Sequence, residues 1–239
     1  MPSTVGCEYI ECGARQLRSG GPFARHNKKG LVRLAPSEIA DADAMVKKLE
    51  LLVLGGLLGA PCAAILSKCA ADGSFFALHP AANALAFLVC FPAVLLSKMH
   101  MFFQMLAMLL LTVGGTAAYM TKDAYGKPHF TSTHSWLAGA TATLASLNML
   151  GGLATTFGGK KTSWQWKNPG HRIGGTLAFL GGGCSIVLGV YSGGWGNSQL
   201  GEDLQLKVAG VTAAAYSLLF LKLVVSTVAA PAVAKKKSN

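Results

Sequence analysis

Six long apolar stretches dominate this sequence of 239 residues. They lie near residues 50–68, 76–97, 101–121, 133–158, 171–194 and 206–230. Each approaches the roughly 20 residues that an α-helix needs to cross about 30 Å of hydrocarbon. The composition, with 51% apolar and 13% charged residues, is a poor match for a soluble domain. The pattern predicts an all-α integral membrane protein, a bundle of six transmembrane helices.

The first stretch is the weakest of the six, because it is short and contains Pro61. A buried helix of a soluble protein is the alternative interpretation for this stretch. The interiors of the others are rich in Gly, Ala, Ser and Thr, as in residues 114–118 and 181–185. Such residues weaken helices in water but let helix backbones approach closely in lipid. These five stretches therefore indicate packed membrane helices.

Polar segments flank the apolar region on both sides. We predict a polar, basic N-terminal tail at residues 1–48, a six-helix transmembrane domain at 49–230 and a basic C-terminal tail at 231–239. The N-terminal tail ends in a short pre-membrane helix, because Pro36-Ser37-Glu38 has the residues of a helix start. No hydrophobic region of a secretory signal precedes it. A mitochondrial presequence fits the arginines of this tail but not its early glutamates.

Lysine and arginine are distributed unevenly between the two membrane faces. Both chain ends and the loops after the second and fourth spans share one face, which receives most of the 21 Lys and Arg residues. The other receives only Lys68, Lys122, Lys127 and Lys207. The positive-inside rule predicts that the first face, here called the positive face, is cytoplasmic, or matrix or stromal in an organelle. The net charge of +11 then indicates topology and contact with anionic lipid, not nucleic-acid binding, for which no folded basic module is present.

Four of the six histidines, His79, His100, His134 and His171, fall at the start of a predicted span. An ionisable side chain in hydrocarbon must find a partner, so each one indicates a functional site. For any single histidine, the alternative is a ring at the headgroup level that is hydrated by water. The four histidines taken together are a more specific indication of a site than any one of them, because the directions of the helices place them in pairs.

Successive spans run in opposite directions, so the second and fourth spans begin at one face and the third and fifth at the other. His79 can therefore face His134, and His100 can face His171. Two such pairs, one near each face, can supply the axial ligands of two haems stacked across the bilayer. Small residues near the histidines would leave room for the macrocycles between the central four helices: Ala81, Ala82, Ala138, Gly139, Gly174 and Gly175.

Two other uses of membrane histidines are less consistent with the sequence. Zinc sites draw closely spaced ligands or mix histidine with cysteine and carboxylate, whereas these pairs are far apart and the six cysteines show no metal-binding spacing. A proton relay would typically include Asp or Glu within the spans, and we expect none there. Lys222 falls within the last span. The four histidines are therefore predicted to be ligands of haem iron.

At these histidines the sequence resembles the cytochrome b561 family, in particular its six-span reductases typified by cytochrome b561 domain-containing protein 2. The similarity runs from about residue 75 to 195. It rests on the segments Leu78-His79-Pro80, His100-Met101-Phe102-Phe103-Gln104, His134-Ser135-Trp136-Leu137 and His171, together with the loop at 126–134. In this family the second- and fourth-span histidines hold one b-type haem, and the third- and fifth-span histidines hold the other. The resemblance thus implies the pairing that alternation predicts.

The resemblance also implies an ascorbate-dependent transmembrane oxidoreductase. Ascorbate would reduce the haem at the positive face, and monodehydroascorbate or a ferric chelate would accept the electron at the other. Lys98, Lys167 and Arg172 lie near the histidines of the positive face and could attract an anionic donor. Their alternative role is that of ordinary positive-inside residues.

On the opposite face Lys122, Lys127 and His129 could receive an anionic acceptor, although His129 could equally be a solvated loop residue. Tryptophans near the span ends are expected to anchor the helices at the interface: Trp136, Trp164, Trp166 and Trp195.

A structural role is the alternative function. A b561-like bundle could serve as an accessory subunit of a larger respiratory or photosynthetic membrane complex, and the long tail would then bind a partner. Against this, a purely structural bundle has no physical need for four histidines at these positions. Members of the family also form homodimers, but no residue here predicts the oligomeric state.

Overall fold

A computed structural model of the chain describes residues 36–96, 99–157 and 169–236. The chain forms two compact units, residues 1–43 and 44–239. Of the first unit, only the start of one long helix belongs to the described residues. Within the described ranges the structure is helical and contains no strand.

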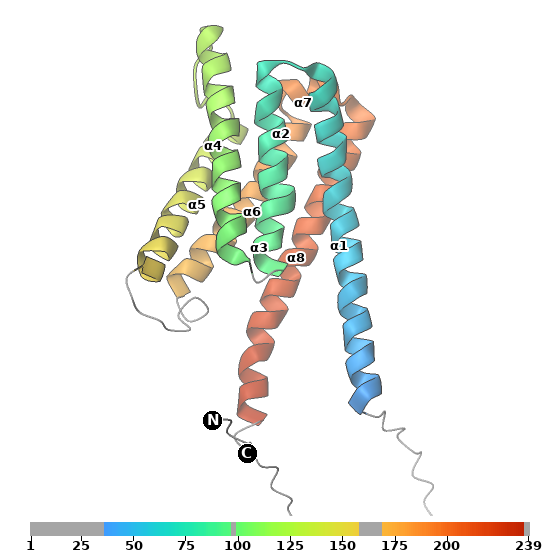
Figure 1. Cartoon of the computed structure of the whole chain (residues 1–239). Helices are drawn as coiled ribbons and strands as arrows, with labels where there is room; N and C mark the ends of the chain where they lie inside the picture. Colours follow the sequence, from blue (N-terminus) through green and yellow to red (C-terminus); the bar gives the residue numbers. More distant parts are fainter. Residues whose placement is uncertain (1–35, 97–98, 158–168, 237–239) are drawn as a thin grey trace, which may run out of the picture. The chain divides into compact units, whose positions relative to one another are not determined.

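The helices follow one another along the chain with short connections (Figure 1). They are α1 (Pro36–Asp72), the 3₁₀ turn η1 (Phe75–Ala77), α2 (Leu78–Ala84), the π-helical segment η2 (Leu85–Cys90), α3 (Phe91–Leu96), α4 (His100–Ala124), α5 (Thr133–Phe157), α6 (Pro169–Tyr191), α7 (Gly194–Gln199) and α8 (Glu202–Lys236). The segments from η1 to α3 run on as one rod, because each begins directly where the previous one ends.

The described chain contains six helical segments that are long and apolar enough to cross a bilayer. This confirms the prediction of six transmembrane helices. Their spans are Ala44–Asp72, Phe75–Val94, His100–Ala124, Thr133–Phe157, Pro169–Tyr191 and Glu202–Val225. The first stretch is among them despite Pro61, and it is longer than the sequence predicted. The chain is therefore an integral, multi-pass membrane protein.

Close packing between the helices depends on glycine, as the small-residue pattern predicted. In the second unit α2 packs against α4, and α6 packs against both α5 and α8 (Figure 1). On α6, a Cβ atom at Gly182 would collide with the ring of Phe87, and one at Gly183 would collide with the ring of Tyr216. Lipid gives helices no hydrophobic drive to associate, so such intimate contact and buried hydrogen bonds hold the bundle together.

Two tight turns bring the starts of α2 and α5 to the same end of the bundle. Gly73 ends α1 with a φ of 62°, and Gly126 follows α4 with a φ of 60°, a region that glycine enters without steric cost. After the first turn, the Ser74 hydroxyl accepts a hydrogen bond from the amide of Ala77 and so caps η1. The helix that carries His79 thus begins at a defined point.

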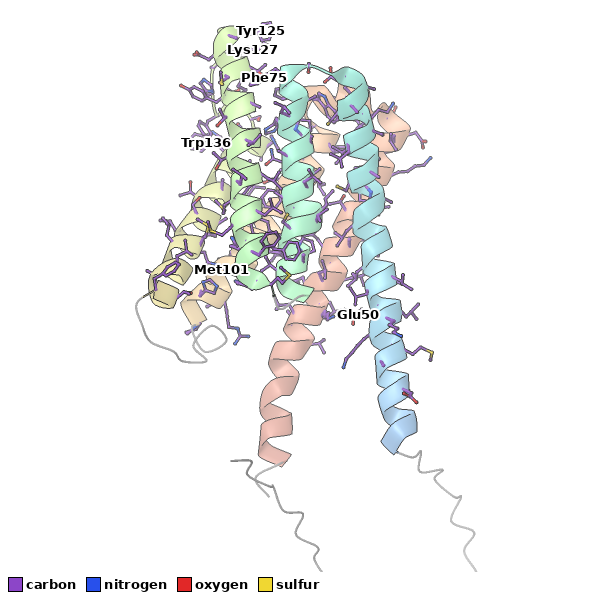
Figure 2. The ribbon with its side chains drawn as sticks, in the orientation of Figure 1. Glu50, Phe75, Met101, Tyr125, Lys127 and Trp136 are labelled. Atoms are coloured by element: carbon purple, nitrogen blue, oxygen red, sulfur yellow. The ribbon has the colours of Figure 1, made fainter. Side chains whose placement is uncertain are left out.

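The expectation that no acidic residue lies within a span is wrong. Asp72, Asp123, Glu202 and Asp203 lie near span ends, and Glu50 lies farther inside the first span. Glu50 belongs to the span Ala44–Asp72, and its carboxylate forms an ion pair with the ammonium of Lys222 on α8. Figure 2 shows Glu50 on the side of α1 that faces α8. Because each charge has the other as its partner, neither is isolated in the apolar region. The hydropathy pattern placed Glu50 at a span boundary, and the helix extends past it.

Candidate functional site

One histidine pair lies where α2 and α5 begin. His79 is the second residue of α2, and His134 is the second residue of α5. Their ring centroids are 6.0 Å apart, and the ring planes are nearly perpendicular at 88°. The two helices start at the same end of the bundle because the single antiparallel helix α4 separates them in the chain. The structure therefore brings together the two residues that helix alternation paired.

Backbone carbonyls orient both rings of this pair. Nδ1 of His79 lies 2.9 Å from the carbonyl oxygen of Gly114, and Nδ1 of His134 lies 3.0 Å from that of Ser185. A carbonyl can only accept, so each Nδ1 carries the proton and donates it. This tautomer leaves Nε2 with its lone pair, the form that ligates a metal, and such a second bond is the usual way in which a ligand ring is fixed.

A cavity of about 390 Å³ surrounds the His79–His134 pair. Its size lies in the range of sites that bind small molecules and cofactors. Its wall is mainly apolar and contains Phe76, Phe87 and Ile186, and polar residues such as Lys122 and Ser132 also line it. Glycine is required beside the pair, because a Cβ at Gly189 would lie 2.8 Å from Cε1 of His134. The cavity is thus shaped around the histidine rings.

The second histidine pair lies at the other end of the bundle, where α4 and α6 begin. His100 is the first residue of α4, and His171 lies in the first turn of α6. Their ring centroids are also 6.0 Å apart, with ring planes at 60°. The His171 ring forms a hydrogen bond with the backbone of Asn148 on α5. A groove of about 40 Å³ lies between the rings, so ring spacing rather than volume supports this site.

The ring spacing matches what a six-coordinate haem requires. A bond between a metal and an imidazole nitrogen is about 2 Å long, and the ring centre lies roughly 1 Å behind that nitrogen, so two opposed imidazoles have centroids about 6 Å apart. Both pairs have this separation. In the described ranges, no three His, Cys, Asp or Glu side chains gather as they would around zinc. The donor sets therefore fit the two axial positions of haem iron.

The residues predicted to meet an acceptor on the opposite face lie in two different places. Lys122 and His129 line the large cavity, and His129 stacks on Tyr119 with centroids 4.3 Å apart. Lys127 does not line the cavity, and its ammonium lies 5.7 Å from the ring centre of Tyr125. Figure 2 shows Lys127 and Tyr125 together at the far end of α4. His129 is thus a cavity residue and not merely a solvated loop residue.

Of the three cations predicted to attract a donor at the positive face, Arg172 belongs to the described residues. It follows His171 directly in α6 and is exposed. Lys98 and Lys167 lie outside the described residues, as do Trp164 and Trp166.

Small residues near the histidines serve two purposes rather than one. Ala138 and Gly139 line the large cavity, as predicted. Gly174 and Gly175 instead accommodate the side chain of Asn148, so they serve the packing of α6 on α5. Two further small residues, Ala81 and Ala82, are packed in the bundle and do not line either cavity.

Five aromatic residues that line the cavity were not predicted to do so: Phe76, Phe87, Tyr119, Phe130 and Trp195. Phe130 has a φ of 52°, an uncommon backbone conformation for a bulky residue. Trp195, expected as an interfacial anchor, also lines the cavity and donates its indole N–H to Asp72 at 2.8 Å. By contrast, Trp136 is exposed on the outside of α5 (Figure 2), as an anchor would be. Of the five aromatic residues at the cavity, only Tyr119 could have been identified from the sequence, because it lies one helical turn before Lys122.

A multi-pass helical bundle with histidine pairs between its helices defines a class: the membrane proteins that transfer electrons through b-type haem. The family model "Eukaryotic cytochrome b561" matches residues 77–195, which contain all four histidines. The chain belongs to this family and is a transmembrane oxidoreductase. Comparison with curated proteins gave no match.

Proposed function

We propose that the chain holds two b-type haems and carries single electrons from ascorbate at the positive face to monodehydroascorbate or a ferric chelate at the opposite face. One observation carries the proposal: two histidine pairs with equal centroid separations of 6.0 Å lie at opposite ends of the same four helices. His100 and His171 would hold the haem at the positive face, and His79 and His134 the other.

When bound, haem b supplies a one-electron couple, and two histidine ligands leave no open position for oxygen chemistry. The protein's part is to orient the histidine ligands and to bury the haem. The carbonyls of Gly114 and Ser185 hold His79 and His134 in one tautomer. The apolar wall around them excludes water, and burial of this kind is one of the means by which proteins set haem potentials.

Cationic and aromatic residues at the two faces support anionic substrates. At the opposite face, the Lys122 ammonium donates to the carbonyl of Pro128 at 3.2 Å, and Lys122 lines the cavity together with His129. At the positive face, three cations lie near His100 or His171 in the sequence: Lys98, Lys167 and Arg172. The excess of cations there supports a cytoplasmic, matrix or stromal location for both chain ends.

The experiment is a reduced-minus-oxidised absorbance spectrum of the purified protein, with haem quantified per chain and with ascorbate and then dithionite as reductants. We expect two low-spin b-type haems per chain, of which ascorbate reduces at least one. A protein that binds no haem would overturn the proposal, and one whose haems only dithionite reduces would remove ascorbate from it.

A further inference from the structure

One buried carbonyl in the second span has no backbone donor. In the π-helical segment η2, the amide of Phe91 donates to the carbonyl of Ala86, five residues earlier. By the same pattern the carbonyl of Phe87 would accept from residue 92, but residue 92 is proline and has no N–H. An unpaired carbonyl costs several kcal/mol in hydrocarbon, so another donor is required there.

Tyr216 of α8 supplies that donor. Its hydroxyl donates to the carbonyl oxygen of Phe87 at 2.5 Å, across 129 residues of sequence. The ring of Tyr216 is buried, and Phe179 stacks on it with centroids 4.4 Å apart. Gly183 leaves the space that the ring occupies. The site is therefore constructed from three helices around one hydroxyl group.

The residue that receives this hydrogen bond also forms part of the cavity wall. Phe87 lies about two turns along the helix from His79, and its side chain lines the cavity of the His79–His134 pair. Its ring packs on the α6 backbone at Gly182 and stacks on Phe91 with centroids 5.0 Å apart. The hydroxyl of Tyr216 thus fixes the backbone from which this wall residue projects.

We propose that Tyr216 is a positioning residue for the haem held by His79 and His134, acting through the carbonyl of Phe87 on the apolar wall of the cavity. The inference rests on the proposed ligand pairing. A π-helical turn is rare and occurs mostly as a single-turn bulge within an α-helix, frequently at a functional site. Without the hydroxyl, the backbone at Phe87 loses a restraint, and the Phe87 ring can shift within the wall of the cavity.

The haem of His100 and His171 provides an internal control for the test. None of the residues that line its groove belongs to η2 or α8. A change caused by Tyr216 should therefore appear in the spectrum of one haem only. A general loss of stability would affect both haems.

The test compares Tyr216→Phe with Tyr191→Phe, a substitution of an exposed tyrosine at the end of α6. For each variant, a redox titration gives the midpoint potential of each haem, and electron paramagnetic resonance gives its g values. Tyr216→Phe should shift the potential and g values of the His79–His134 haem and leave the other haem unchanged. Tyr191→Phe should shift neither. Unchanged values in Tyr216→Phe, or equal shifts in both haems, would overturn the inference.

Two further samples keep the outcomes separate. If Tyr216→Phe does not fold, it is combined with Pro92→Ala, which returns an N–H to residue 92 that can pair with the Phe87 carbonyl. The double variant should then fold, and any remaining shift should be confined to the His79–His134 haem; a double variant that still does not fold, or that shifts both haems equally, would overturn the inference. Wild-type protein with fewer than two haems would contradict the proposed function itself. Two haems in the wild type with no selective shift in the variant would contradict only the role of Tyr216.

Discussion

The four paired histidines differ in their surroundings, although their ring spacings agree. His79 and His134 face a large apolar cavity and are each held by a helix carbonyl. His100 is exposed at the start of α4, and only a small groove separates it from His171. The first pair is thus in a drier environment than the second. Because burial and hydrogen bonding to the ligands tune haem potentials, the two proposed haems should have different potentials.

Removing one histidine should remove one haem. His79→Ala and His134→Ala should each lower the haem content from about two per chain to about one, because a single imidazole leaves one axial position empty. The remaining haem should have the spectrum of the His100–His171 site. Haem extraction and low-temperature absorbance check this. Loss of both haems in every variant would contradict two independent sites.

The charge of Lys122, which lines the cavity, should matter more than that of Lys127, which does not. Lys122→Gln should lower kcat/KM for a ferric chelate by about threefold to tenfold, because a nearby cation raises the local concentration of an anion. Lys127→Gln is the matched control, since Lys127 lies on Tyr125 outside the cavity. Stopped-flow oxidation of the reduced protein measures both. Lys122→Arg should retain most of the rate, and equal losses for Lys122→Gln and Lys127→Gln would contradict a local role.

At the scale of the helices, the glycines of α6 set how closely its neighbours approach. A methyl group at residue 189 would lie 2.8 Å from Cε1 and 3.2 Å from Nδ1 of His134. Gly189→Ala should therefore displace the ring from the Ser185 carbonyl and abolish one haem per chain. Gly151→Ala is the control, because nothing lies within 4 Å of the added methyl group. Haem content should fall only in Gly189→Ala, and full occupancy there would show that the ring can yield.

The π-helical segment permits a double-mutant cycle for stability. Tyr216→Phe should destabilise the protein by about 1 kcal/mol or more, since it leaves a buried carbonyl unpaired. Pro92→Ala offers that carbonyl a backbone amide, so the cost of Tyr216→Phe should be smaller in a Pro92→Ala background. Thermal unfolding in detergent measures the four proteins of the cycle. Strictly additive effects would mean that proline is not the reason why Phe87 needs Tyr216.

Sequence patterns predicted the spans and the histidine pairs but not the contacts of α8. Hydropathy depends on local composition, and helix alternation alone places His79 near His134. The bond from Tyr216 to Phe87 joins segments 129 residues apart, and no local pattern encodes it. The ion pair of Glu50 with Lys222 was missed for the same reason, although each charge was visible at or inside a span. The role of Trp195 was also missed, because its partner Asp72 lies at the end of a distant helix.

For the whole molecule, the two proposed roles differ in behaviour after purification. A reductase that acts alone should elute from a sizing column as a monomer or small oligomer. Ascorbate should reduce it as fast as it turns over. An accessory subunit should co-purify with a large assembly and be reduced slowly or not at all. Native mass measurement and reduction kinetics of protein from its own membrane decide between them.

The proposed entry of electrons at the cation-rich face predicts a direction for electron flow. In proteoliposomes that contain ascorbate, the wild-type protein should reduce a ferric chelate outside, because the path His100–His171 to His79–His134 crosses the bilayer. His79→Ala should keep ascorbate reduction of the remaining haem but stop reduction of the external chelate. His100→Ala should lose both, since electrons then have no entry at the positive face. If His100→Ala still accepts electrons from ascorbate while His79→Ala does not, the direction is the reverse of the one proposed, and the cation-rich face is the exit.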